Sequence, residues 1–444
     1  MIRMVNEIIE LDEEKGGFTM LSSWEKLKTR KIWMSSIFSA LCFPEIIFAI
    51  FIAPTKYTFI RQTYLPFLPS PLIIFYIIII FLITLQIFQK GKLPHIPLSL
   101  LLPYFILACI IALSLIYTSN LEYGKIKCLE FMMYSTLALF APFFLFRGLN
   151  NINRFIYTLL VMGIFLFIIL FISNPYLLTR TFSTIFGSNY LLIQHISGMA
   201  VLIICYYFLL KNQPLKKQVI WVFLLVILIM AIIYPGGKGA VFTLLITTII
   251  IAIPSIKFKN KFKIMNKRLL IIPLIIFIIE CGTLGYFHFV MKFSALTGRL
   301  GAISSPQHYN RIERLENAKV ALKLFSQYPL SGVGIGGFSV YSYKLEGIER
   351  FKYPHNILLE ALAELGLIGF ISLSLILFFA FKNLLYLQKI YKYSLLPGVF
   401  MSIFIFTFLN SLTSQDITNL ALFAFIGCSY AIEHSLKDEK ECEG

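Results

Sequence analysis

The chain has 444 residues, of which 58% are hydrophobic and only 14% are charged. Soluble domains average about 45–50% apolar and about 25% charged residues, so this composition excludes a soluble enzyme with a water-facing surface. We attribute the formal net charge of +17 to basic residues that flank membrane spans on the cytoplasmic side. A nucleic-acid partner is therefore not expected.

Residues 1–31 carry charges of both signs and have no short apolar core followed by a small-residue cleavage site. Such a core is the mark of a cleavable signal peptide. We therefore expect this segment to be a cytoplasmic N-terminal tail that precedes the first membrane span.

The apolar residues then come in blocks of about 20, the length that crosses the hydrocarbon core of a bilayer. In lipid each backbone polar group must be satisfied within its own segment, so each block is expected to be a helix. We predict an all-α, polytopic integral membrane protein of about twelve transmembrane helices. The predicted spans are 32–53, 72–88, 98–117, 128–146, 155–173, 189–210, 218–234, 239–254, 269–290, 357–380, 394–411 and 417–433.

The chain accordingly divides into nine spans within 32–290, one large loop at 291–356, three spans within 357–433 and a cytoplasmic tail at 434–444. With the N-terminus inside, the inside segments hold about 24 basic residues and the outside segments about 15. About nine of those 15 lie in the large loop, to which the positive-inside rule gives little weight. The loop 291–356 is therefore predicted to be extracytoplasmic.

A lysine stands between two glycines at the outer end of predicted spans seven and eight, in the run Gly236-Gly-Lys-Gly239. Lys238 fits two interpretations. One is a helix-end lysine whose ammonium reaches the membrane surface. The other is a phosphate-binding cation, because glycines on either side let a ligand approach closely.

The large loop contains a predicted helix, Arg311 to Tyr328, with apolar residues at Ile312, Leu315, Ala318, Leu322 and Phe325. This spacing makes one helical face apolar. We expect that face to rest on the membrane interface. Arg311 and Arg314 are three residues apart and project from neighbouring positions. They are either a solvated face or a site for an anionic substrate, since guanidinium forks bind phosphate well.

Gly332, Gly334 and Gly337 match the pattern G-x-G-x-x-G. A helix precedes them where a dinucleotide-binding unit needs a strand, so we reject that interpretation. Close backbone packing, where the loop folds back on the helices, explains the glycines better.

His355 and Asn356 stand where the loop returns to the membrane. Asn356 is predicted to cap the next helix, with Glu360 in its first turn. His355 is a candidate base, because an imidazole titrates near neutral pH. Asp416 is a weaker candidate, with an ordinary loop carboxylate as its favoured interpretation.

The seven cysteines form no C-x-x-C pair, and no pair of carboxylates stands at an outer helix end. We predict no metal site and no cofactor.

Two long runs within this loop resemble a known family. The first is Arg314-Leu-Glu, followed later by Tyr328-Pro-Leu-Ser-Gly-Val-Gly-Ile-Gly-Gly-Phe338. The second is Pro354-His-Asn-Ile-Leu-Leu-Glu-Ala-Leu-Ala-Glu-Leu-Gly-Leu-Ile-Gly369. Together they resemble the signature of the O-antigen ligase and O-antigen polymerase superfamily, membrane glycosyltransferases of the bacterial cytoplasmic (inner) membrane with a GT-C-like fold.

The resemblance implies a role for each candidate. His355 would be the catalytic base, and Arg314, Arg311 and Lys238 would bind a diphosphate, with Asn356, Gly332 and Gly334 in support. Lys238 stands where the family commonly has arginine, and it keeps the charge but not the bidentate fork. Ala318 replaces a tryptophan that is frequent in the family.

The implied donor is an undecaprenyl-diphosphate-linked oligosaccharide, transferred by a metal-independent inverting reaction to an acceptor glycan or glycolipid. Membrane lipids surround the chain, and a chain-length regulator and a flippase are potential partners. A polymerase is slightly preferred to a ligase that acts on lipid A core or another terminal acceptor. A flippase or transporter is the third alternative, and it would need charges at the bilayer midplane. Glu45 and Glu280 are the acidic residues that we identify inside spans.

Overall fold

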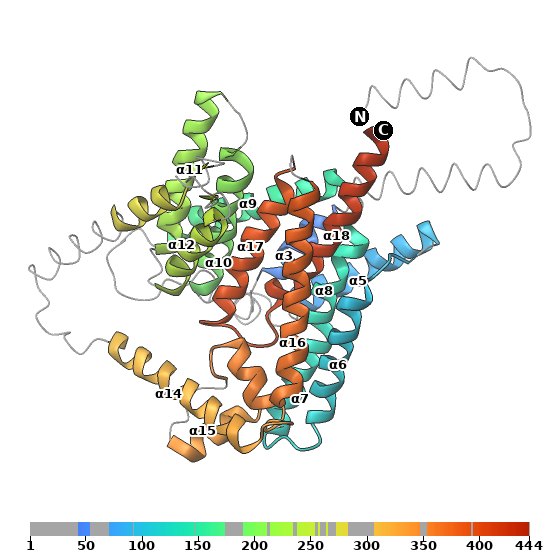
Figure 1. Ribbon diagram of the computed structural model, residues 1–444, viewed down its shortest axis with the longest axis vertical. Coiled ribbons are helices and arrows are strands. Elements are labelled where there is room, and N and C mark those ends of the chain that lie inside the picture. The colour runs from blue at the N-terminus through green and yellow to red at the C-terminus, as the bar shows by residue number, and fades with distance from the viewer. Residues whose placement is uncertain are drawn as a thin grey trace, which may run out of the picture.

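The computed structural model is built almost wholly from helices (Figure 1). Predictions for the tail 1–31, and for loop residues 291–305 and 347–352, fall outside the described residues. The structure describes residues 43–53, 71–91, 93–146, 148–173, 190–210, 214–233, 238–253, 256–257, 263–264, 272–282, 306–346, 353–391 and 394–443.

Every predicted span overlaps a helix, so the prediction of a helical membrane protein fold is confirmed for the described residues, which add one short pair of strands. Six of these helices are long and apolar enough to cross a membrane, while the count of about twelve stays a prediction. The helices are α3 (Pro44–Ile52), α5 (Pro71–Lys90), α6 (Leu98–Ser114), α7 (Leu121–Glu130), α8 (Thr136–Leu145), α9 (Leu149–Ser173), α10 (Tyr190–Ile203), α11 (Leu215–Ile233), α12 (Lys238–Ala252), Ile272–Gly282, α14 (Pro306–Gln327), α15 (Phe338–Glu346), α16 (Ile357–Ile390), α17 (Leu396–Ser411) and α18 (Leu420–Glu443).

Two helices contain π-helical turns, which lie at η1 (Phe131–Ser135) and η2 (Ile204–Leu209). The first joins α7 to α8 in one continuous apolar segment. This segment begins at Leu121, seven residues before the predicted start at 128, because Asn120 caps it by accepting a hydrogen bond from the Tyr123 amide at 3.2 Å. A short antiparallel pair, β1 (Ile256–Lys257) and β2 (Lys263–Ile264), lies between α12 and the helix Ile272–Gly282.

Aromatic side chains fill the core of the bundle, and Phe131, Phe155 and Phe423 are fully buried there. Lipid tails are as apolar as these side chains, so close packing rather than removal from water holds the helices together. Glycines permit that approach: a Cβ at Gly198 would overlap the ring of Phe406. Small residues at helix contacts are the usual device in membrane bundles.

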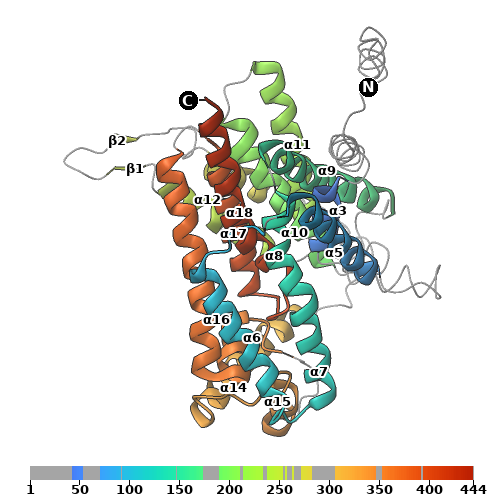
Figure 2. The same cartoon turned by 90° about the vertical axis from the view of Figure 1, so that its right-hand side faces the viewer.

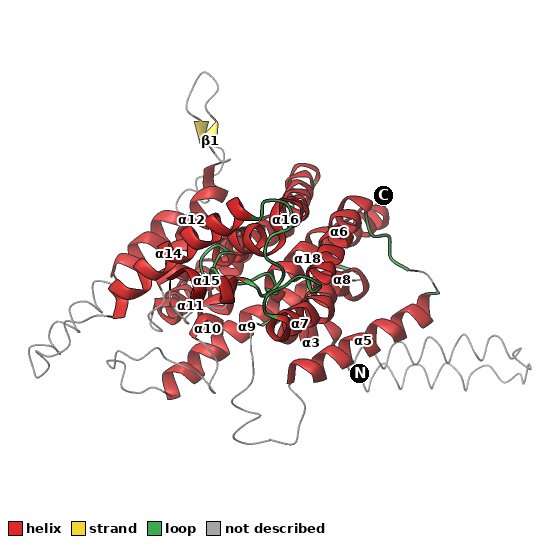
Figure 3. Cartoon of the chain, turned by 90° about the horizontal axis from the view of Figure 1, so that it is seen from below, coloured by secondary structure: helices red, strands yellow, loops and turns green. Residues whose placement is uncertain are grey.

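The helix α16 lies beside α6, α17 and α18 and is the longest in the described part of the chain (Figure 2). It runs on to Ile390, ten residues beyond the predicted end. Gly366 interrupts its first part with a φ of 66° and a ψ of −164°. The helices α14 and α15 gather at the end of the bundle where α16 begins (Figure 1 and Figure 2). Viewed from that end, they lie across the ends of the other helices (Figure 3).

Candidate active site

The helix α14 packs on α16 through a face other than the predicted apolar stripe. Asn317, Ala321 and Leu324 are buried, whereas Leu315 and Leu322 of the stripe are 60% and 52% exposed. The buried face of α14 therefore differs from the apolar stripe, and it includes the polar residue Asn317. Whether the exposed leucines rest on the membrane stays a prediction. Arg314 lies one turn before Asn317, at the same edge as the buried face, and its side chain is exposed.

The glycine run exchanges hydrogen bonds with α16 at its kink. The amide of Leu367 donates to Pro329 at 2.8 Å instead of to Ala363, four residues before it. The carbonyl of Ala363 accepts from the amide of Val333 at 3.0 Å instead. Gly366, with its left-handed backbone, makes this exchange possible. The loop is thus joined to the helix by main-chain bonds on both sides of the kink.

The turn after α6 holds the opposite side of the glycine run. The hydroxyl of Thr118 donates to the Ile335 carbonyl at 2.8 Å, and Ser114 accepts from the Ile335 amide at 3.1 Å. A Cβ on Gly334 would lie 2.6 Å from the Cα of Thr118. The interpretation of the glycines as points of close backbone packing is confirmed.

Replacing Gly332 with alanine should destabilise this loop. The residue has a φ of 65°, and its Cβ would lie 2.6 Å from the Leu365 amide. A non-glycine residue in that region costs of order 1–3 kcal/mol, before any steric overlap is counted. We expect Gly332→Ala to lower the apparent unfolding temperature of the detergent-solubilised protein, measured by circular dichroism. Gly148→Ala is the matched control, since nothing lies within 4 Å of that Cβ position; equal stability of the two variants would contradict the packing role.

His355 has a φ of 58°, and it is the non-glycine residue with a positive φ in the described part of the chain. Such a conformation is costly for a residue with a side chain and persists where the surroundings hold it. Its ring lies 4.5 Å from the ring of Tyr353, centroid to centroid. A strained backbone at a titratable side chain is typical of functional sites.

Asn356 fixes the point where the loop becomes a helix. Its side-chain oxygen accepts hydrogen bonds from the amides of Leu358 and Leu359, at 3.0 and 3.1 Å. The prediction that Asn356 caps the helix is confirmed. The cap is adjacent to His355, so it also sets where the imidazole stands relative to α16.

Four influences act on the pKa of His355. Burial and the nearby guanidinium of Arg314 lower this pKa, in that order, and together they outweigh the two influences that raise it. These are a hydrogen bond to the backbone of Ser414 and the negative charge of Asp416. The net pKa lies below its ordinary value, so the imidazole is neutral at physiological pH. A neutral ring that donates one N–H to a carbonyl keeps a lone pair on its second nitrogen, as a base requires.

The turn between α17 and α18, residues 412–419, faces His355. Asp416 shapes it by accepting hydrogen bonds from the Thr418 amide and hydroxyl, at 3.0 and 2.7 Å. Asp416 is therefore a structural loop carboxylate that also contributes charge near the imidazole. Sequence reasoning had no signal for Ser414, because its contact with the histidine runs through the backbone.

The start of α12 reaches the same turn. A Cβ on Gly239 would lie 3.5 Å from the hydroxyl of Thr413, and Lys238 is the first residue of the helix. The predictions for the side chains of Lys238 and Arg311 lie outside the described residues. The structure thus brings Arg314, His355, the 412–419 turn and the first turn of α12 to one end of the bundle.

Residues 223–374 match the family model described as O-antigen ligase. This segment supports the resemblance of the chain to the O-antigen ligase and polymerase superfamily. The match covers about one third of the 444 residues and includes Lys238, Arg314, the glycine run and His355. No curated protein matches the chain. Members of the superfamily are glycosyltransferase-like enzymes of polysaccharide biosynthesis, and the apolar helices agree with a multi-pass membrane protein of this kind.

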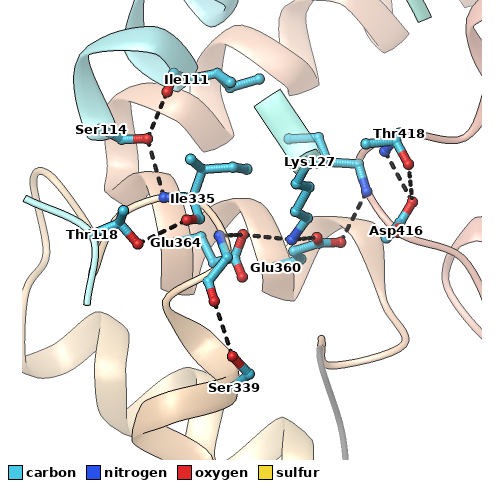
Figure 4. A network of polar contacts seen from close by, with 12 residues as sticks. Ile111, Ser114, Thr118, Lys127, Ile335, Ser339, Glu360, Glu364, Asp416 and Thr418 are labelled. Carbon is cyan, nitrogen blue, oxygen red and sulfur yellow. Dashed lines mark hydrogen bonds and ion pairs between the residues drawn. The ribbon is translucent and has the colours of Figure 1, made fainter. Parts of the chain in front are cut away.

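One polar cluster in the chain escaped sequence reasoning (Figure 4). The ammonium of Lys127, on α7, forms ion pairs with Glu360 and Glu364 on α16, and all three side chains are buried. Glu45 and Glu280 are therefore not the only acidic residues buried in candidate spans. The sequence did contain a signal for this cluster. A lysine directly precedes one predicted span, and two glutamates four residues apart lie near the start of another predicted span.

Proposed function

We propose that this chain is a bacterial surface-polysaccharide polymerase that transfers an undecaprenyl-diphosphate-linked glycan to a sugar hydroxyl on the extracytoplasmic face of the cytoplasmic membrane. The observation that carries the proposal is a neutral, conformationally constrained imidazole beside an arginine, within the segment that matches the O-antigen ligase family. A base and a cation at one site are the two groups that metal-independent glycosyl transfer from a diphosphate requires.

In the proposed reaction, His355 takes the proton of the acceptor hydroxyl. The acceptor oxygen forms a bond to the anomeric carbon while the bond from that carbon to the diphosphate oxygen breaks. The electron pair leaves with the diphosphate, and the imidazolium later releases its proton to water. Attack from the side opposite the leaving group inverts the anomeric centre.

The cations act on the leaving group. Arg314 is exposed at the edge of α14, and its charge is felt at His355, so a diphosphate bound by it would lie next to the base. Arg311, one turn earlier, and Lys238, at the start of α12, are proposed to complete the diphosphate site. The backbone amides in the first turn of α12 favour an anion there as well. Charge stabilisation of this kind replaces the metal ion that other sugar transferases use.

A ligase that delivers finished glycan to lipid A core or another terminal acceptor would use the same base and cations. Polymerase is preferred because the sequence has no identified lipid A site. Transport is less well supported: the buried charges of Lys127, Glu360 and Glu364 lie at the end of the bundle that carries the loop, and they are paired with each other. A transporter would need them near the bilayer midplane.

The glycan profile of a deletion strain tests the proposal. Loss of a polymerase should leave surface glycans of a single repeat unit, and the wild-type gene supplied on a plasmid should restore the long chains. Long chains that remain on the carrier lipid would instead identify a ligase. An unchanged profile would overturn both activities.

A further inference from the structure

The buried cluster formed by Lys127, Glu360 and Glu364 joins four separate segments around the site (Figure 4). Glu360 accepts a hydrogen bond from the amide of Ile417 at 3.0 Å. Glu364 accepts one from the amide of Gly336 at 2.9 Å. Lys127 lies between the two carboxylates and pairs with both. The cluster therefore connects α7 and α16 to the glycine run and to the 412–419 turn.

The two glutamates use their oxygens differently. Glu360 employs both: Oε1 pairs with Lys127 and Oε2 accepts from Ile417. Glu364 receives both of its donors, Lys127 and Gly336, on Oε2, while its Oε1 has neither an ion pair nor a hydrogen bond with any of the described residues. A glutamine has only one side-chain oxygen. It could therefore serve both donors at position 364 but not at position 360.

The hydrogen bond that Glu360 accepts from the 412–419 turn bears directly on the position of His355.

 The amide that Glu360 holds belongs to Ile417, which is 1% exposed. Three residues earlier, the backbone of Ser414 is hydrogen-bonded to the imidazole, and the adjacent Asp416 contributes its charge. Glu360 also lies one turn into the helix that His355 precedes. Its carboxylate thus fixes the distance between the helix that presents the histidine and the turn that faces it.

We propose that Glu360, anchored by Lys127, is a positioning residue that holds the 412–419 turn against His355. The expected effect on catalysis rests on the proposed function, whereas the expected effect on the turn does not. Glu360 contacts neither substrate nor reacting atoms in this scheme. It acts through Ile417 on the backbone and side-chain partners of the imidazole.

The variants Glu360→Gln and Glu364→Gln form a matched pair. Each removes one buried negative charge from the same helix, one turn apart, and leaves Lys127 with one carboxylate. With a lipid-linked donor and purified full-length protein, we expect Glu360→Gln to lower kcat about 10–100-fold, since small misplacements of reacting groups have effects of this size. KM should change little. Glu364→Gln should keep a kcat close to that of the wild type.

The pH profile separates positioning from a general loss of structure. The groups that act on the pKa of His355 are Arg314 from α14, and Ser414 and Asp416 from the turn. The turn supplies both influences that raise this pKa. If the turn moves away in Glu360→Gln, both of these influences and the burial of the imidazole change, so the acidic limb of kcat should shift from its wild-type position. If the substitution merely reduced the fraction of folded protein in the preparation, the pH profile of kcat would keep its wild-type shape.

A second readout needs no activity. Cysteine placed at the buried position 417, by Ile417→Cys, should react slowly with a maleimide in membranes, and mass spectrometry can quantify the modification at that site. Adding Glu360→Gln should speed the reaction about 10–100-fold, because one charge-assisted hydrogen bond changes an opening equilibrium by that factor. Adding Glu433→Gln, at the far end of α18, should change nothing. Equal rates with and without Glu360→Gln would overturn the positioning role, even if transfer activity is never observed. Faster labelling without any wild-type transfer would overturn the proposed function alone.

Discussion

His355→Ala should abolish glycan transfer while the protein continues to fold. The loss of a general base lowers the rate by typically about 10²–10⁴-fold. The protein should still fold, because the helix cap belongs to Asn356 and the change removes only the hydrogen bond of the imidazole to the Ser414 backbone. Transfer from a lipid-linked donor should be measured at equal amounts of purified protein. His95→Ala, which alters an exposed histidine just before α6, is the control.

The same base determines how activity depends on pH. His355 must be neutral to accept a proton, and its pKa is lowered below the ordinary value of about 6.5. Activity should therefore persist through mildly acidic pH and fall only as the pH drops through this lowered pKa. An acidic limb above pH 7, or near-wild-type transfer by His355→Ala, would remove the histidine from the mechanism.

Lys127→Met should prevent the protein from accumulating in the membrane. The change leaves the carboxylates of Glu360 and Glu364 buried next to each other without a cation. Breaking a buried ion pair in this way costs about 3–5 kcal/mol, a large part of the total stability of about 5–15 kcal/mol for a typical domain. The amount of folded protein can be measured by fluorescence-detected size-exclusion chromatography in detergent.

Two further variants make this result specific. Lys437→Met removes a lysine whose side chain is 56% exposed and paired with Glu433, so it should leave the yield unchanged. Combining Lys127→Met with Glu360→Gln and Glu364→Gln removes all three charges and should recover part of the yield, since neutral replacement of a buried ion cluster is far less costly than removal of one partner. A normal yield of Lys127→Met alone would contradict the importance of the cluster.

Local sequence patterns predicted the helices well. Apolar blocks of membrane length located a helix at every predicted span, and Asn356 was correctly predicted as a cap from its place before an apolar run. The candidate site residues came mainly from the two runs that resemble the family. Arg314 belongs to the first run and His355 to the second. The α15 helix was missed because it has only nine residues and lies in a polar stretch of the loop.

The remaining features depend on contacts between distant parts of the chain. Lys127 and Glu364 are 237 positions apart, so no local pattern could pair them. The contact between His355 and Ser414 runs through a backbone atom, to which the sequence gives no signal. The buried face of α14 was not predicted, because it includes Asn317, and burial of a polar residue cannot be read from apolar spacing.

The interruption of α16 at Gly366 divides this helix into two segments that can tilt separately. The short outer part, which begins just after His355, is tied to the glycine run by the main-chain bonds at Ala363 and Leu367. The long inner part lies among the other membrane helices. Tilting of the inner part, as a bilayer thins or thickens around it, can be absorbed at the glycine hinge. The imidazole would then keep its alignment with the glycine run while the rest of the helix changes its tilt.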